Sequence, residues 1–325
     1  MRRRPLGTTG LEVTPVGFGL AALGRPAYID VGRDEDLGRP RSPEVMEQRT
    51  HEVLDAAFAA GIRYVDAARS YGDAERFLAS WLARRPDAAA EVVLGSKWGY
   101  TYVAGWRRDA DVHEVKDHSV GALRRQAPRS LAALGEHLAL YQVHSATLES
   151  GVLEDRAVLE ELAHMRDRHG LVIGMSVSGV RQADVVRRAL ELRDGPFRCV
   201  QATWNVLEPS AGDALAEARD AGWGVIVKEA LANGRLTARG SDVVVRALRT
   251  VGSRIGAAED VVALAAVLAN PWVDVVLSGA VTPAQVRSNA TAVDVDLGPD
   301  DLASLGELAV APEAYWDDRA ALAWS

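Results

Sequence analysis

The hydrophobic pattern of this 325-residue chain alternates between two kinds of segment. Short runs rich in Val, Ile and Leu are separated by longer stretches in which Ala, Leu and Arg recur at helical spacing. Apolar runs this short, bounded by turn residues, are typical of buried β-strands. The predicted strands are Pro15–Gly19, Arg63–Asp66, Val92–Lys97, Ala139–His144, Val172–Ser176, Cys199–Thr203, Gly224–Lys228 and Asp274–Ser278.

Helical segments separate the predicted strands along the chain. They are Glu44–Ala60, Asp73–Ala83, Val120–Leu134, Arg156–His169, Gln182–Leu192, Asp213–Ala221, Asp260–Ala269 and Pro283–Ala292. Strands that alternate with helices pair in parallel through helical crossovers. This order leaves two architectures, a closed barrel and a doubly wound sheet.

Glycine positions favour the barrel. Gly61, Gly170 and Gly222 each stand where a helical segment ends and the next strand begins. Glycine tolerates the left-handed backbone that such a helix end requires, so these junctions indicate repeated βα units. No Gly-x-Gly-x-x-Gly follows the first predicted strand, which weakens the doubly wound Rossmann alternative. We therefore predict a (β/α)8 TIM barrel and expect residues 1–325 to form one domain.

Several segments lie outside the alternation. Pro5–Val13 is predicted to form a hairpin that could close the amino end of the barrel. Three long loops, Leu20–Pro43, Trp98–Ser119 and Leu231–Glu259, follow predicted strands and should crowd the carboxyl face, where barrel enzymes place their sites. The aromatic-rich tail Ala311–Ser325 is expected to dock on the barrel.

Composition and charge narrow the function classes. The formal net charge of −8 disfavours a nucleic-acid partner, and no apolar run is long enough to span a membrane. The single cysteine, Cys199, excludes an internal disulfide and a thiolate metal cluster. The acidic run Asp34–Asp36 is interpreted as a solvated loop rather than a metal site. With no export signal evident, we expect a cytoplasmic protein without a metal ion.

Four polar residues at or just after the ends of predicted strands carry the candidate chemistry: Asp66, Tyr71, Lys97 and His144. A phenol is a weak acid at neutral pH, and a neighbouring ammonium should lower its pKa. A carboxylate beside the ammonium should keep the ammonium charged, and an imidazole could orient a substrate oxygen. This set suits carbonyl reduction or alcohol oxidation, provided that a nicotinamide cofactor exchanges the hydride.

The chain resembles the aldo-keto reductase family in an ordered set of motifs. The matching stretches are Leu6–Val13, Gly61–Ala68 with Tyr71, Gly72 and Glu75, Gly95–Gly99, Tyr141–His144, Ile173–Ser176, Gln201 with Asn205, and Gly279–Ala280 with Asn289. The resemblance implies an eight-stranded barrel, a cofactor that is usually NADPH, and a catalytic tetrad with Tyr as general acid. Carried over residue by residue, that tetrad is Asp66, Tyr71, Lys97 and His144.

The resemblance also assigns cofactor contacts. Ser176 and Gln201 match residues that hold the nicotinamide carboxamide. Lys228 ends the seventh strand where an aromatic residue or Arg often faces the nicotinamide ring, and Asn289 matches an adenine-binding residue.

One part of the cofactor site departs from the family pattern. Gly279 begins the stretch Gly-Ala-Val, and Gln285 follows, where many members place Lys or Arg on the 2′-phosphate of NADPH. Arg287 is the nearby basic residue. The cofactor is therefore expected to be NADPH or NADH. The absence of a Lys or Arg side chain at Gln285 makes use of NADH plausible.

Aromatic residues are the candidate substrate contacts, because stacking faces suit sugars and aromatic carbonyl compounds. The candidates for the pocket wall are Tyr28, Trp98, Tyr100, Trp106, Trp204 and Trp316.

These observations predict an oxidoreductase that transfers a hydride between a nicotinamide cofactor and a carbonyl or alcohol substrate. The substrate is an aldehyde, ketone or sugar, and Tyr71 is the general acid and base. The alternative is a nicotinamide-nucleotide-binding regulatory subunit with little turnover, like the potassium-channel β-subunits that share this barrel. The sequence leaves the oligomeric state and the preferred direction open.

Overall fold

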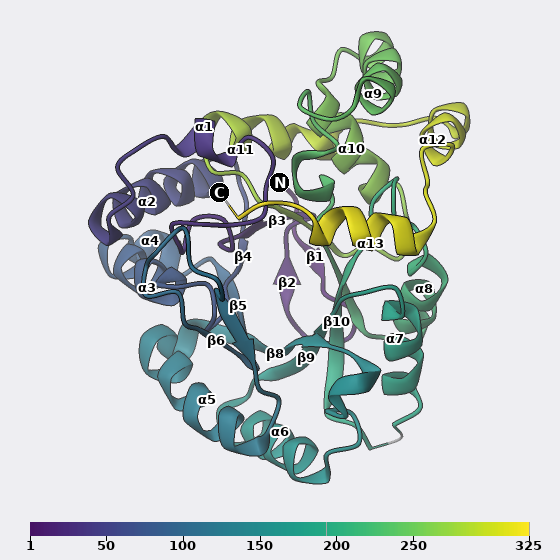
Figure 1. Ribbon diagram of the computed structural model, residues 1–325. Helices are drawn as coiled ribbons and strands as arrows, with labels where there is room; N and C mark the ends of the chain where they lie inside the picture. The colour runs from purple at the N-terminus through teal and green to yellow at the C-terminus, as the bar shows by residue number, and fades with distance from the viewer. Residues whose placement is uncertain (193, 325) are drawn as a thin grey trace.

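The computed structural model describes residues 1–192 and 194–324, and its centre is a closed barrel of parallel strands (Figure 1). Neighbouring strands along the chain pair in parallel, and the last strand pairs with the first. The barrel strands are β3 (Val16–Gly19), β4 (Tyr64–Asp66), β5 (Val93–Trp98), β8 (Leu138–Ala146), β9 (Val172–Val177), β10 (Phe197–Thr203), β11 (Gly224–Lys228) and β12 (Val275–Ser278). The predicted (β/α)8 barrel is confirmed.

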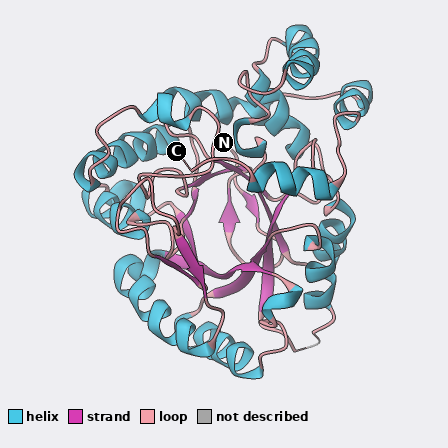
Figure 2. Cartoon of the chain, in the orientation of Figure 1, coloured by secondary structure: helices cyan, strands magenta, loops and turns pink. Residues whose placement is uncertain are grey.

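Helices form a ring outside the strands (Figure 2). The helices that follow the successive strands are α2 (Pro43–Ala59), α3 (Ala74–Arg84), α5 (Val120–Leu134), α6 (Arg156–His169), α7 (Gln182–Leu190), α8 (Gly212–Asp220), α10 (Glu259–Leu268) and, after the last strand, α11 (Pro283–Ala290). Each buries an apolar face against the strands, which are themselves buried on both sides. Near-continuous apolar strands and amphipathic helices are therefore what this architecture requires.

The predicted N-terminal hairpin is present and closes the amino end of the barrel. Its strands β1 (Arg4–Pro5) and β2 (Glu12–Val13) pair antiparallel. The buried Leu6 and Val13 pack into the barrel interior in one cluster with Tyr64. At the turn, the backbone N–H of Gly7 donates to Asp274 Oδ2 over 3.1 Å. The hairpin thus fills the end of the barrel opposite the carboxyl ends of the strands.

Substitution of Gly7 by alanine should destabilise the fold more than the same change at Gly10. Both glycines have positive φ, 54° and 80°, so both alanines are strained. An added Cβ at Gly7 would meet the backbone of Gly224 and Trp223 at 2.4 Å, whereas at Gly10 it meets nothing within 4 Å. We expect a loss of about 3 kcal/mol for Gly7→Ala and about 1 kcal/mol for Gly10→Ala. Urea unfolding of both variants tests this, and equal losses would contradict the tight fit of the hairpin.

The three segments expected as long loops contain secondary structure. Short helix α1 (Arg33–Leu37) lies in the first, and the hairpin of β6 (Tyr100–Tyr102) and β7 (Glu114–Lys116) lies in the second. The third contains the 3₁₀ turn η3 (Ala232–Gly234) and helix α9 (Asp242–Ile255). For this last segment the expectation of a loop was wrong. Its buried residues Val245, Leu248 and Val251 recur every three residues, which is a helical signal in the sequence.

The C-terminal tail docks on the barrel, as expected for residues 311–324; Ser325 lies outside the described residues. After helix α12 (Pro299–Gly306), helix α13 (Pro312–Ala320) runs beside the barrel opening in Figure 1. Tyr315 is fully buried, and Asn205 Nδ2 donates to its hydroxyl over 3.0 Å. The remaining short helix, α4 (Pro86–Ala89), precedes β5. Among the described helices, none has the length and apolar character that a membrane crossing requires.

Candidate active site

The carboxyl ends of the strands open into one cavity of about 730 Å³. The register of the parallel strands sets Asp66 of β4 beside Gly95 of β5, and Lys97 of β5 beside Gln142 of β8. The predicted tetrad residues Asp66, Tyr71 and His144 are in the cavity wall. Lys97 lies directly behind them, fully buried. The structure therefore brings all four predicted residues together.

Lys97 and Asp66 form a buried ion pair between Lys97 Nζ and Asp66 Oδ1. The ammonium also donates to the backbone carbonyl of Ala67 over 3.0 Å. The second carboxylate oxygen, Asp66 Oδ2, accepts hydrogen bonds from Tyr64, Gln142 and Gln201 at 3.0 to 3.2 Å. A buried charge pair is stable only when its remaining polar atoms are satisfied, and this one meets that condition.

The Tyr71 hydroxyl lies between two nitrogen atoms. Lys97 Nζ is 3.5 Å from the hydroxyl oxygen, and His144 Nε2 is 3.4 Å from it. Tyr71 comes from the turn between β4 and α3, and Gly72 continues that turn with a φ of 57°. The turn is held by a hydrogen bond from the N–H of Asp73 to the carbonyl of Gly24. A loop residue thereby has a fixed position against two strand residues.

The electrostatic surroundings of Tyr71 differ from the expectation. Burial raises the pKa of the phenol well above its ordinary value, and the Asp66 carboxylate raises it further. Lys97 does not lower it below that value, because its charge is compensated at contact distance by Asp66. The expectation of an acidified phenol was therefore wrong for this structure. At neutral pH the Tyr71 hydroxyl keeps its proton.

His144 is a neutral imidazole. Burial lowers its pKa well below the ordinary value, and the positive charges of Lys97, Arg25 and Lys228 lower it further. Ser70 Oγ lies 3.3 Å from Nδ1, and His118 Nε2 lies 2.8 Å from the His144 carbonyl oxygen, which can only accept. If Ser70 donates to Nδ1, the proton of the ring sits on Nε2 and faces the cavity.

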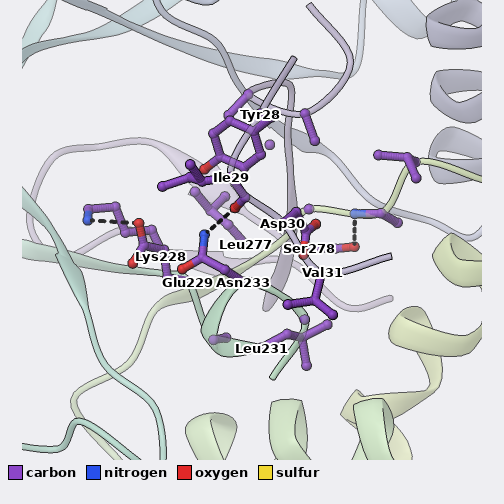
Figure 3. A pocket seen from close by; sticks show the side chains of 18 of the residues that line it. Tyr28, Ile29, Asp30, Val31, Lys228, Glu229, Leu231, Asn233, Leu277 and Ser278 are labelled. Atoms are coloured by element: carbon purple, nitrogen blue, oxygen red, sulfur yellow. Dashed lines mark hydrogen bonds and ion pairs between the residues drawn. The ribbon is translucent and has the colours of Figure 1, made fainter. Parts of the chain in front are cut away.

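The expected cofactor residues fall into two groups. Gln201 and Lys228 are in the cavity wall near the tetrad, whereas the buried Ser176 lies behind it and accepts from the N–H of Ser145. Lys228 Nζ donates to Thr203 Oγ1 over 2.7 Å. Burial lowers the pKa of Lys228 to about 8, so the side chain is mostly charged at pH 7. Lys228 and Glu229 are side by side in Figure 3.

The second group lies at the other end of the same cavity. Gly279, Gln285 and Asn289 all line the wall there. Gln285 Oε1 accepts from the N–H of Val281 over 2.9 Å, and Asn289 Oδ1 accepts from Ser278 Oγ over 2.7 Å. Gln285 is thus fixed by backbone N–H groups, and Asn289 by the side chains of Ser278 and Asp260. The cavity thus extends from the tetrad to the loop after β12.

The expectation for the aromatic wall was largely wrong. Tyr28 and Tyr100 line the cavity, and the other four candidates, Trp98, Trp106, Trp204 and Trp316, do not. Trp98 and Trp204 directly follow Lys97 and Thr203, so strand alternation turns them toward the helices. There Trp98 packs on His118, and Trp204 packs on Trp272.

The other two tryptophans pack on outer elements. Trp106 packs edge-on against Phe77, and its indole donates to the carbonyl of Arg41 over 2.8 Å. Trp316 packs edge-on against Tyr315 of its own helix.

Several wall residues were missed by the sequence analysis. Arg25 is buried, forms an ion pair with Glu114 at 2.8 Å, and has its guanidinium carbon 5.2 Å from the centre of the Tyr71 ring. Trp324 stacks on His113 with ring centres 4.0 Å apart. Asp36, interpreted as solvated, has a side chain only 17% exposed and lines the cavity. These residues come from the short helix α1, from loops and from the tail, where no regular hydrophobic pattern identifies the side chains that face the cavity.

The chain belongs to the aldo/keto reductase family, because the model of that family matches residues 16–310. Members of the family are oxidoreductases that generally reduce carbonyl compounds with NAD(P)H.

Relatives match over nearly the whole chain. The NADH-specific methylglyoxal reductase of Escherichia coli (strain K12) is 26% identical over 96% of this chain and 100% of its own. The aldo-keto reductase str7 of Strobilurus tenacellus is 24% identical over 95% and 92% of the two chains. The solved structure of aldo-keto reductase AKR11C1 from Bacillus halodurans (holo form) is similar in fold, with a TM-score of 0.75 over 96% and 97% of the chains at 22% identity.

Proposed function

We propose that this protein interconverts a small carbonyl compound and its alcohol, with a nicotinamide nucleotide as the redox partner and Tyr71 as general acid and base. One observation carries the proposal. The Tyr71 hydroxyl faces a cavity while lying within 3.5 Å of both Lys97 Nζ and His144 Nε2. A partly buried phenol with two such neighbours has few structural uses and is suited to proton transfer.

The cavity fits a dinucleotide. Its volume of about 730 Å³ lies in the range of ligand sites, and polar side chains line both ends. Gln201 and Lys228 would hold the nicotinamide end, and Gln285 and Asn289 would hold the adenosine end. When bound, the nicotinamide supplies or accepts the hydride.

Each tetrad residue then has a task in reduction. His144 Nε2–H donates a hydrogen bond to the carbonyl oxygen and orients it. The Tyr71 hydroxyl gives its proton to that oxygen as negative charge develops there. Lys97 stabilises the phenolate that remains, and Asp66 holds Lys97 in position. In the oxidative direction, the Tyr71 phenolate takes the proton back from the alcohol.

The substrate is proposed to be a small aldehyde or ketone. Tyr28, Tyr100 and Trp324 present aromatic surface around the tetrad, and Lys116 and the Arg25–Glu114 ion pair add charged groups to the same wall. The relative in Escherichia coli acts, by its name, on methylglyoxal with NADH. That name and the missing base near Gln285 support NADH as the preferred nucleotide here.

Titration with NADH and NADPH, followed by quenching of tryptophan fluorescence, tests nucleotide binding. Trp324 lies in the cavity wall and provides a local signal. We expect saturable quenching, and oxidation of the bound nucleotide when methylglyoxal or another small aldehyde is added. Binding without turnover on a panel of aldehydes, ketones, sugars and alcohols would favour a regulatory role, and no binding would refute the proposal.

Tyr71 and His144 should contribute no pH dependence to the rate of reduction between about pH 6 and 8, where the wall residues Asp30 and Lys228, with pKa values of about 7 and about 8, are the groups that titrate. The general acid must carry its proton, and the raised pKa of Tyr71 keeps it protonated throughout this range. His144 must stay neutral, and its lowered pKa keeps it neutral. The measurement is kcat/KM against pH. A limb with its midpoint near 6.5 that persists in Asp30→Asn would indicate a histidine with an ordinary pKa and contradict this description of His144.

A further inference from the structure

One wall of the cavity is formed by a segment from the loop after β3. Tyr28, Ile29, Asp30 and Val31 lie along the cavity in Figure 3, facing Asn233 of the turn η3. Asn233 Nδ2 donates to the carbonyl of Ile29 over 2.9 Å, and the N–H of Val31 donates to the carbonyl of Asn233 over 3.0 Å. These bonds fix the path of the segment into helix α1, which carries Asp36.

The Asp36 carboxylate is held by two partners in the cavity wall. Arg239 forms a bidentate pair with it, with both N–O distances 2.7 Å. Gln285 Nε2 donates to Asp36 Oδ2, also over 2.7 Å. Asp36 lies on helix α1, Arg239 lies between η3 and α9, and Gln285 lies in the first turn of α11. The Asp36 carboxylate therefore has a fixed position in the cavity wall.

The charge balance at this end of the cavity is negative. Arg239 is the basic residue of the wall there, and Asp36 already neutralises it. Glu259 and Asp260 line the same end. Glu259 forms an ion pair with Arg249 at 2.5 Å, and Asp260 accepts from Asn289 and Ser288 at 2.8 Å. Among the described residues of this wall, no cation remains without an acidic partner.

We propose that Asp36 is a specificity-determining residue that makes the cavity prefer NADH over NADPH. The inference rests on the proposed function, in which the nicotinamide lies at Tyr71 and the adenosine lies at the Gln285 end. A carboxylate accepts hydrogen bonds from the hydroxyls of an unmodified ribose. A 2′-phosphate in the same place meets a like charge at short range, and the one guanidinium that could bind it is occupied by Asp36.

The test compares the dissociation constants of NADH and NADPH for wild type and for Asp36→Asn, by tryptophan quenching. Asparagine keeps the size of the side chain and removes its charge. We expect the variant to gain about 30-fold in affinity for NADPH, because the repulsion is gone and Arg239 loses its bidentate partner and keeps only the exposed Glu35, at 3.7 Å. Affinity for NADH should fall by less than about 5-fold, since an amide oxygen still accepts from a hydroxyl.

Asp34→Asn is the matched control. Asp34 lies on the same short helix and loses the same charge, but it pairs with Arg41 and Arg108 and is not in the cavity wall. Its ratio of NADPH to NADH affinity should equal that of wild type. A similar shift in both variants would indicate a general field effect and overturn the assignment to Asp36.

The double variant Asp36→Asn with Arg239→Gln identifies the group that binds the phosphate. If the released Arg239 binds the 2′-phosphate, the double variant loses most of the gain for NADPH. An unchanged nucleotide ratio in Asp36→Asn, with both nucleotides still bound, would overturn the inference and leave the proposed function standing. Failure of every variant and of wild type to bind either nucleotide would instead refute the proposed function.

Discussion

Replacement of Tyr71 by phenylalanine should lower kcat for carbonyl reduction by about 10³-fold or more while leaving nucleotide affinity within about 2-fold. The change removes one oxygen atom. That oxygen lies 3.5 Å from Lys97 Nζ and 3.4 Å from His144 Nε2, and the described wall offers no other hydroxyl between these two nitrogens. Steady-state kinetics and fluorescence titration measure the two quantities.

Tyr100→Phe provides the control for this experiment. Tyr100 also lines the cavity, with its ring 5.0 Å from the ring of His144, but no hydrogen bond joins its hydroxyl to Lys97 or His144. Its kcat should stay within a few-fold of wild type. If Tyr71→Phe retains near-normal kcat, Tyr71 has no part in proton transfer and the proposed mechanism is wrong.

Replacement of Lys97 by methionine should lower kcat by a similar factor and also destabilise the protein. Asp66 and Lys97 are 2% and 0% exposed, so the change leaves a buried carboxylate without its counter-ion. Breaking a buried pair in this way costs about 3–5 kcal/mol. Thermal unfolding and steady-state kinetics measure the two effects separately.

The double variant Lys97→Met with Asp66→Asn separates stability from catalysis. Removing both charges should restore much of the lost stability, since asparagine can still accept from Tyr64 and Gln201. Activity should stay low, because the phenolate left after proton transfer has no cation beside it. Recovery of kcat together with stability would show that Lys97 acts only as a structural partner of Asp66.

The sequence predicted the barrel well because its strands carry their own signal. Parallel strands covered by helices are buried on both faces, so each is a short continuous apolar run. The polar residue that ends such a run stands out, which is how Asp66, Lys97 and His144 could be found. The prediction for the segment that contains α9 was wrong. The length of Leu231–Glu259 favours a loop, whereas the spacing of Val245, Leu248 and Val251 indicates the helix.

The wall of the cavity was less predictable. Residue type alone favours Trp98 and Trp204 as pocket residues. Strand alternation after Lys97 and Thr203, however, turns both side chains away from the cavity. Arg25, Asp36 and Trp324 come from segments without a regular hydrophobic pattern. Contacts with residues distant in the sequence place their side chains in the cavity wall. The sequence around Asp36 indicates a solvated acidic run. Only the fold brings Arg239, more than two hundred residues away, beside this carboxylate.

The position of Trp324 has a practical consequence for handling the protein. Arg25 lies 4.9 Å from the centre of the Trp324 ring, and Ile29 pairs with Trp324 as an isolated β-bridge. Proteolytic cleavage before Trp324 would therefore remove part of the cavity wall. Kinetic constants from such cleaved protein would describe an altered pocket, so the mass of the preparation should be checked before any measurement of substrate preference.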